Sequence, residues 1–243
     1  MKKFLIIDNR MRKIEKEKLE VLGYELIEVP TKKDLYYEVS SHVDIFCAKI
    51  KDKIVLESTI FEKFQSLSNE NVILDEKIII GNKNVGNVYP LDILYNVCNI
   101  GNFVIHNFKY TDSKILDLIE NLKLEKIAVN QGYSKCSIAV IDNNSAITCD
   151  KKISKKLKEN GIDTLLLDNV NNIKLYSENN RFSNMNGFIG GAISNVNGKI
   201  IISGDLKKID EDDKIRKFIE KRNLEIIEFK GLDVIDYGGI IQI

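Results

Sequence analysis

Apolar and polar positions along this chain follow one order that recurs. From residue 136, an apolar strand (CSIAVID) is followed by a two-residue turn, a second strand (SAIT), an amphipathic helix over 151–160 and a third strand (TLLLD). Three further segments show the same order, and their first strands begin near residues 42, 95 and 188. In the helices apolar residues are spaced by three and four, whereas the strands are short and nearly all apolar. The pattern predicts an α/β protein built from ββαβ units.

The two ends of the chain carry complementary parts of the same unit. DVIDYGGIIQI is a lone first strand beginning near 234, and the N-terminus supplies a second strand, a helix and a third strand in KKFLIID, RKIEKEKLEVLG and YELIEV. Units this small must pack on one another, and a ring closed by the termini leaves no sheet edge exposed. We therefore predict a five-bladed α/β propeller, a single domain over residues 1–243, with helices outside and the fifth blade formed by both termini.

Composition narrows the possible partners. Lys and Arg number 36, as do Asp and Glu, so a formal charge of zero argues against a nucleic-acid partner. No apolar run approaches the roughly 18 residues of a membrane span, and we expect a cytoplasmic protein without membrane contact. Four cysteines without C-x-x-C spacing indicate free thiols and no metal site. GFIGGA at 187–192 lacks the third glycine of a dinucleotide fingerprint, so no cofactor is expected. The sequence does not indicate an oligomeric state.

Candidate catalytic residues begin the first strands, which a closed ring brings to a common axis. His42 and Asp44 are two positions apart on a first strand, a spacing that points both side chains to the same face. Cys136 opens another first strand. Together these three side chains would supply a nucleophile, an acid/base and an anchor for a cation. Taken singly, each also has a plain structural interpretation, with the cysteine as small core filler.

Further polar and glycine residues occupy equivalent positions. Asp236, Asn96, Gly190 and Gly191 also begin first strands, so we expect them to line a substrate site at the axis. The glycines permit either a close approach of backbones or a tight turn, and both interpretations stay open. Lys135, directly before Cys136, is expected to point to the opposite face of its strand as a surface charge.

These residues resemble motifs of the pentein superfamily, which includes agmatine deiminase, arginine deiminase and dimethylarginine dimethylaminohydrolase. HVDIFCAKI at 42–50 is similar to the His-x-Asp strand of those enzymes. IAVNQGYSKCSI at 127–138 resembles the segment that precedes their catalytic cysteine, and DYGGI at 236–240 resembles their acidic-Gly-Gly element. The resemblance covers the whole chain at the level of repeats, with the ring opened at a different point. Asp236 stands where a glutamate is expected, and a shorter side chain reaches less far.

The resemblance implies a cysteine-dependent hydrolase or deiminase acting on a C–N bond of a small guanidine or amidine compound. Cys136 would be the nucleophile, His42 the general acid/base, Asp44 a carboxylate that grips the guanidinium, and Asp236 a second anchor. Such a site needs a lowered thiol pKa, which a charged His42 or the substrate cation would provide. Some penteins, such as the ribosome anti-association factor, perform no chemistry. The alternative is therefore a non-catalytic protein that binds a ribosome or a small amine, with Cys136 and His42 filling the channel.

Overall fold

Small sheets of one kind dominate the structure, a computed structural model that describes residues 3–61, 76–168, 170–176, 185–210 and 212–243. Within these ranges the strands form five three-stranded sheets and one two-stranded sheet, so the fold is mixed α/β. In each three-stranded sheet the first strand is antiparallel to the second, and the second is parallel to the third.

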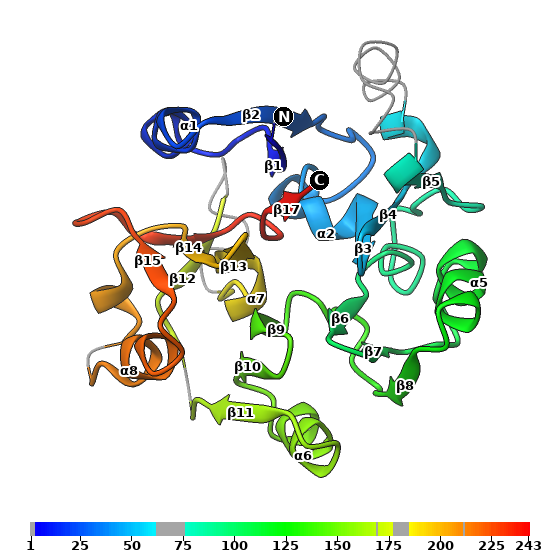
Figure 1. The fold of residues 1–243 in the computed structure, drawn as a ribbon. Helices are drawn as coiled ribbons and strands as arrows, with labels where there is room; N and C mark the ends of the chain where they lie inside the picture. Colours follow the sequence, from blue (N-terminus) through cyan, green and yellow to red (C-terminus); the bar gives the residue numbers. More distant parts are fainter. Residues whose placement is uncertain (1–2, 62–75, 169, 177–184, 211) are drawn as a thin grey trace.

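The first, second and third strands of the five sheets are β3 (Cys47–Ile50), β4 (Lys53–Leu56) and β5 (Ile78–Ile80); β6 (Cys98–Ile100), β7 (Phe103–His106) and β8 (Glu125–Ala128); β9 (Ile138–Asp142), β10 (Ser145–Thr148) and β11 (Asp163–Leu166); β13 (Ile193–Val196), β14 (Lys199–Ile202) and β15 (Glu225–Ile227); and β17 (Ile241–Gln242), β1 (Lys3–Asp8) and β2 (Tyr24–Val29). The two-stranded sheet joins β12 (Ile173–Leu175) to β16 (Val234–Asp236). In Figure 1 the first strands lie toward the middle of the molecule and the third strands toward its outside.

The two ends of the chain meet in one sheet, as the sequence predicts. Strand β17 pairs antiparallel with β1, with Gln242 opposite Leu5 and Ile241 opposite Ile6. Figure 1 shows the N- and C-termini close to each other. The pairing gives the last strand of the chain a partner and leaves β2 as the third strand of that sheet.

Helices connect the second and third strands and lie on the outside in Figure 1. They are α1 (Lys13–Val21), α5 (Ser113–Asn121), α6 (Lys151–Glu159) and α8 (Lys214–Glu220). Apolar residues at helical spacing are buried in α5, at Ile115 and Ile119, and in α6, at Ile153 and Leu157. Aspartates cap two of them, because Asp112 accepts from the Lys114 amide and Asp150 from those of Lys152 and Ile153. No helix in the described ranges is long and apolar enough to cross a membrane.

One-turn helices precede two of the first strands, where the sequence predicted strand. They are α2 (Val43–Phe46) before β3 and α7 (Ile189–Ala192) before β13, while Cys136 lies in a turn before β9. The placement of His42 and Asp44 on a strand was therefore wrong, because His42 caps α2 and Asp44 lies in its first turn. A short, continuous apolar run does not distinguish helix from strand by periodicity. These three segments, α2, α7 and the turn at Cys136, lead directly into the first strands β3, β13 and β9.

Candidate functional site

The thiol of Cys136 is the centre of a buried polar cluster. Its turn, 134–137, follows a loop and leads into β9, and the residue is 3% exposed. The Cys136 Sγ–H donates to Asp44 Oδ2 at 2.8 Å, and Asn96 Nδ2 donates to Sγ at 3.1 Å. Three predicted site residues from separate segments are therefore in direct contact.

His42 and Asp44 each carry a buried polar atom without a partner. Within the described ranges, His42 Nε2 and Asp44 Oδ1 make no hydrogen bond, although both residues are almost completely inaccessible. The other imidazole nitrogen, Nδ1, lies 3.8 Å from Asp236 Oδ1, too far for a hydrogen bond but near enough for an ion pair when the imidazole is protonated. Buried polar atoms are normally paired, so these two atoms mark a place where a polar ligand would be stabilised.

Asp236 ties the end of β16 to the segment before α7. Its Oδ1 accepts from the Gly238 amide at 2.9 Å, and its Oδ2 accepts from the Phe188 amide at 2.8 Å. Both oxygens are therefore engaged by backbone groups. The prediction that Asp236 anchors substrate stays a prediction.

Close approach explains the glycine pair in α7. A Cβ on Gly191 would lie 1.7 Å from Asp236 Oδ1, and one on Gly190 would lie 2.3 Å from the Lys135 carbonyl oxygen. The Gly190 amide also donates to the Cys136 carbonyl at 2.7 Å. Of the two interpretations left open by the sequence, the structure supports tight packing of backbone against the site.

Asn96 holds the turn that carries the thiol. Its Oδ1 accepts from the amides of Lys135 at 2.8 Å and Cys136 at 3.2 Å. The expectation for Lys135 was wrong, because its Nζ reaches inward and donates to the Gly190 carbonyl at 2.8 Å. Consecutive side chains in a turn do not alternate between opposite faces as they do in a strand.

Burial and neighbouring charges set the protonation of the cluster. Burial raises the pKa of Asp44 to about 6, against the opposing effects of the Lys135 and His42 charges. Burial, and then the negative charges of Asp44 and Asp236, raise the pKa of the Cys136 thiol well above its ordinary value. Without a ligand the thiol is therefore protonated at neutral pH. The lowered thiol pKa that catalysis needs is not a property of the ligand-free molecule.

Two buried residues near this cluster had no sequence signal. His106 is fully buried, with Nδ1 2.6 Å from Thr111 Oγ1 and Nε2 3.1 Å from the Gly132 carbonyl oxygen in the loop that leads to Cys136. Asp92 accepts a hydrogen bond from the Tyr133 hydroxyl, and its Oδ1 has no partner in the described part of the chain. Their burial arises from packing between distant segments, which local patterns do not report.

The stability of the fold should depend on pH through His106. Burial lowers its pKa from 6.5 to about 4, so the unfolded chain binds the proton more tightly than the folded one. The stabilisation is complete above pH 6.5 and is lost as the pH falls toward 4, by up to about 3 kcal/mol. Urea unfolding of wild type and His106→Gln at several pH values tests this. The stability difference between the two should shrink with acidification, and a pH-independent difference would contradict the assignment.

Among the residues that the structure describes, no group of three or more His, Cys, Asp or Glu side chains is placed to hold a metal ion. The four cysteines are free thiols, three buried and Cys149 half-buried, in agreement with the sequence analysis.

Comparison with known proteins identifies the family. A family model described as "Family of unknown function (DUF6873)" matches residues 6–241. The chain belongs to this family. No curated protein matches the DUF6873 chain.

Solved structures of pentein enzymes share the fold of the DUF6873 chain. Dimethylarginine dimethylaminohydrolase from Pseudomonas aeruginosa, complexed with citrulline, superposes with a TM-score of 0.55 at 11% identity over 100% of both chains. Agmatine deiminase from C. jejuni superposes with a TM-score of 0.53 at 14% identity. The match covers 93% of this chain and 75% of the agmatine deiminase chain. The resemblance to the pentein superfamily is therefore confirmed at the level of the fold.

Proposed function

We propose that the DUF6873 chain is a single-domain, five-bladed α/β propeller over residues 1–243 whose centre binds a small guanidine or amidine compound and cleaves a C–N bond. The observation that carries this proposal is the contact of the Cys136 thiol with Asp44, beside unpartnered atoms of Asp44 and His42. The five sheets with one strand order, and the termini paired in one of them, support the propeller.

Asp44 is suited to hold the cation. With a pKa of about 6 it is ionised at neutral pH, and its Oδ1 is free to accept from a guanidinium N–H. A bound cation would oppose the carboxylate charges that now raise the pKa of Cys136, and so would favour the thiolate. The ligand itself would therefore activate the nucleophile.

The proposed chemistry uses Cys136 as nucleophile and His42 as general acid/base. As the cation binds, the thiol proton passes to His42 Nε2, and the thiolate attacks the guanidinium carbon to form a C–S bond. The C–N bond then breaks as the departing amine takes that proton from His42. Water, deprotonated by His42, next displaces the sulfur and yields a ureido product, with the thiol restored.

Turnover is tested by incubating the protein with a panel of guanidine compounds and measuring ammonia or amine together with ureido product. We expect release by wild type and by Cys149→Ala, the half-buried control thiol, and a loss of about a thousandfold or more in Cys136→Ala. Release that persists in Cys136→Ala would refute the nucleophile.

A second candidate function is binding without turnover. The raised pKa of Cys136 and the complete burial of the cluster favour it, because a neutral buried thiol is a poor nucleophile. In that case a guanidine compound would protect Cys136 from iodoacetamide without releasing any product. Protection with product formation would favour the hydrolase.

A further inference from the structure

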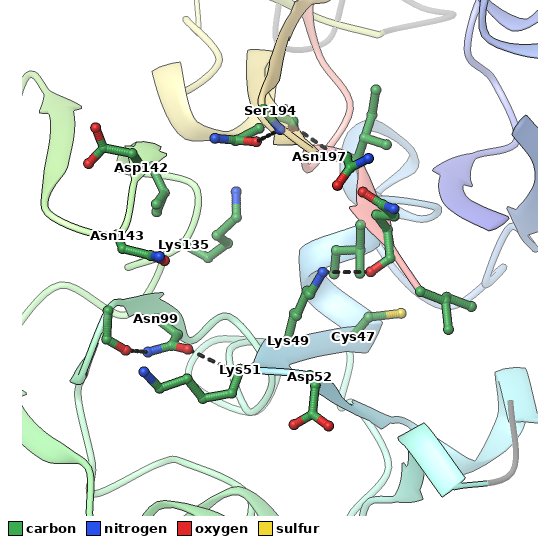
Figure 2. Close-up of a pocket in the computed structure, with 18 of the residues that line it drawn as sticks. Cys47, Lys49, Lys51, Asp52, Asn99, Lys135, Asp142, Asn143, Ser194 and Asn197 are labelled. Carbon is green, nitrogen blue, oxygen red and sulfur yellow. Dashed lines mark hydrogen bonds between the residues drawn. The ribbon is translucent and has the colours of Figure 1, made fainter. Parts of the chain in front are cut away.

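An open cavity lies among the first strands of the sheets. It has a volume of about 870 Å³ and is lined by residues of β3, β6, β9, β13 and β17 or their turns. Cys136, His42 and Asp44 do not line it. Figure 2 shows Lys49 and Lys51 on one side of this space and Lys135 on another. The cavity and the thiol cluster are therefore lined by different side chains. They are neighbours in the chain, because Lys135 lines the cavity and directly precedes Cys136.

Lysine side chains give this cavity its charge. The lining contains Lys49, Lys51, Lys77 and Lys135. Three of their ammonium groups donate to neutral oxygens: Lys49 to the Gln242 carbonyl at 2.7 Å, Lys51 to Asn102 Oδ1 at 2.8 Å, and Lys135 to the Gly190 carbonyl. For Lys49 and Lys51 these contacts satisfy hydrogen bonds without cancelling charge, whereas the Lys135 charge also acts on the Asp44 carboxylate.

The pKa of Lys49 reports the charges around it. Partial burial and then the repulsion by the Lys77 charge lower this pKa, while the Asp52 charge opposes them. An anion in the cavity would relieve that repulsion.

The two acidic residues of the lining are engaged by cations from elsewhere. Asp142 Oδ2 lies 3.3 Å from Arg222 Nε, and Asp52 Oδ2 lies 3.9 Å from Lys53 Nζ. Neither Arg222 nor Lys53 lines the cavity. The lining holds four lysines against two aspartates, and this excess of positive charge would attract opposite charge.

We propose that this cavity binds a small organic anion carrying two or more negative charges, of the phosphate or carboxylate type. Lysine ammonium groups would hold the charges, and the amide side chains of Asn143 and Asn197 in the lining add hydrogen-bond donors. Apolar side chains in the same lining accommodate an organic body: Val97, Val140, Ile193 and Ile240. The volume lies in the range of small-molecule sites.

Calorimetric titration with tripolyphosphate and with citrate, at constant ionic strength, tests the proposal. We expect wild type to bind at least one of them, and Lys49→Gln and Lys51→Gln each to weaken the affinity about tenfold. Lys155→Gln, an exposed lysine of α6 paired with Glu159, serves as the matched control and should bind like wild type. Binding of both probes, or of one alone, supports the site and identifies the charged group that it accepts.

Two results would overturn the proposal. One is the absence of binding by either probe at millimolar concentration. The other is equal weakening by Lys155→Gln and by the cavity variants, which would indicate general attraction to surface charge. Thermal unfolding of each variant establishes that it is folded. Because binding is measured without turnover, failure here is distinguishable from failure of the guanidine hydrolase, which the Cys136→Ala comparison decides.

Discussion

Replacing Asp44 by asparagine is expected to weaken guanidine binding by about a hundredfold or more while making the ligand-free Cys136 thiol more reactive. Binding is lost because the buried carboxylate that would hold the cation is gone. Reactivity rises because the Asp44 charge contributes to the raised thiol pKa, and each unit by which that pKa falls increases the thiolate fraction about tenfold. The measurements are guanidine protection and the rate of iodoacetamide labelling of Cys136, followed by mass spectrometry at mildly alkaline pH.

The opposite signs of these two effects separate electrostatics from general damage. Asp117→Asn, at an exposed position of α5, is the matched control and should leave both measurements unchanged. A variant that merely disturbed packing would expose buried thiols generally, so Cys98, whose pKa is raised by burial and not by the Asp44 charge, would label faster as well. Cys47 is not a control, because the Asp44 charge also raises its pKa. Unchanged or slower labelling of Cys136 in Asp44→Asn would contradict the electrostatic account.

Gly191→Ala is expected to lower the free energy of unfolding by about 3 kcal/mol or more. The added methyl group would overlap Asp236 Oδ1, and that carboxylate is held by the amides of Gly238 and Phe188. Helix α7 has little freedom to retreat, because the Gly191 carbonyl accepts from the amides of Tyr237 and Gly239 at 3.2 and 2.9 Å. Urea unfolding measures the loss.

A glycine with open surroundings provides the comparison. Gly161 follows α6 with a φ of +76°, and a methyl group added there would meet no other part of the described chain within 4 Å. Gly161→Ala should therefore lower the free energy of unfolding by only about 1 kcal/mol, because only the backbone conformation is strained. Equal costs for the two substitutions would show that the contact with Asp236 is not tight in solution.

Local sequence patterns were sufficient to predict the outer helices and hairpins of the repeated units. The helix expected over 151–160 is α6, and the strand pairs β9–β10 and β13–β14 form hairpins where the apolar runs were separated by short turns. These elements depend on residues near one another in the chain, so spacing alone reports them. Complementary fragments at the two ends likewise predicted that the C-terminal strand pairs with β1. The predicted start of that strand near 234 was wrong, because Val234–Asp236 form β16 and pair with β12 in a separate sheet.

Patterns failed where the chain crosses the middle of the molecule. The run VDIFCAKI was interpreted as one strand, but its first half is the helical turn α2, and Lys135 was assigned to the surface although it reaches Gly190. In both places neighbours from distant segments decide the conformation. The Val43 amide, for example, donates to the carbonyl of Tyr237 at 3.4 Å, near the other end of the chain.

The sequence by itself determined the hairpins and outer helices of each unit and their order, because periodicity and repetition are encoded locally. Tertiary structure alone decided the protonation of the Cys136 thiol, the inward path of Lys135 and the separate lysine-lined cavity. These properties arise from burial and from charges contributed by segments far apart in the chain, and a linear pattern carries no measure of either.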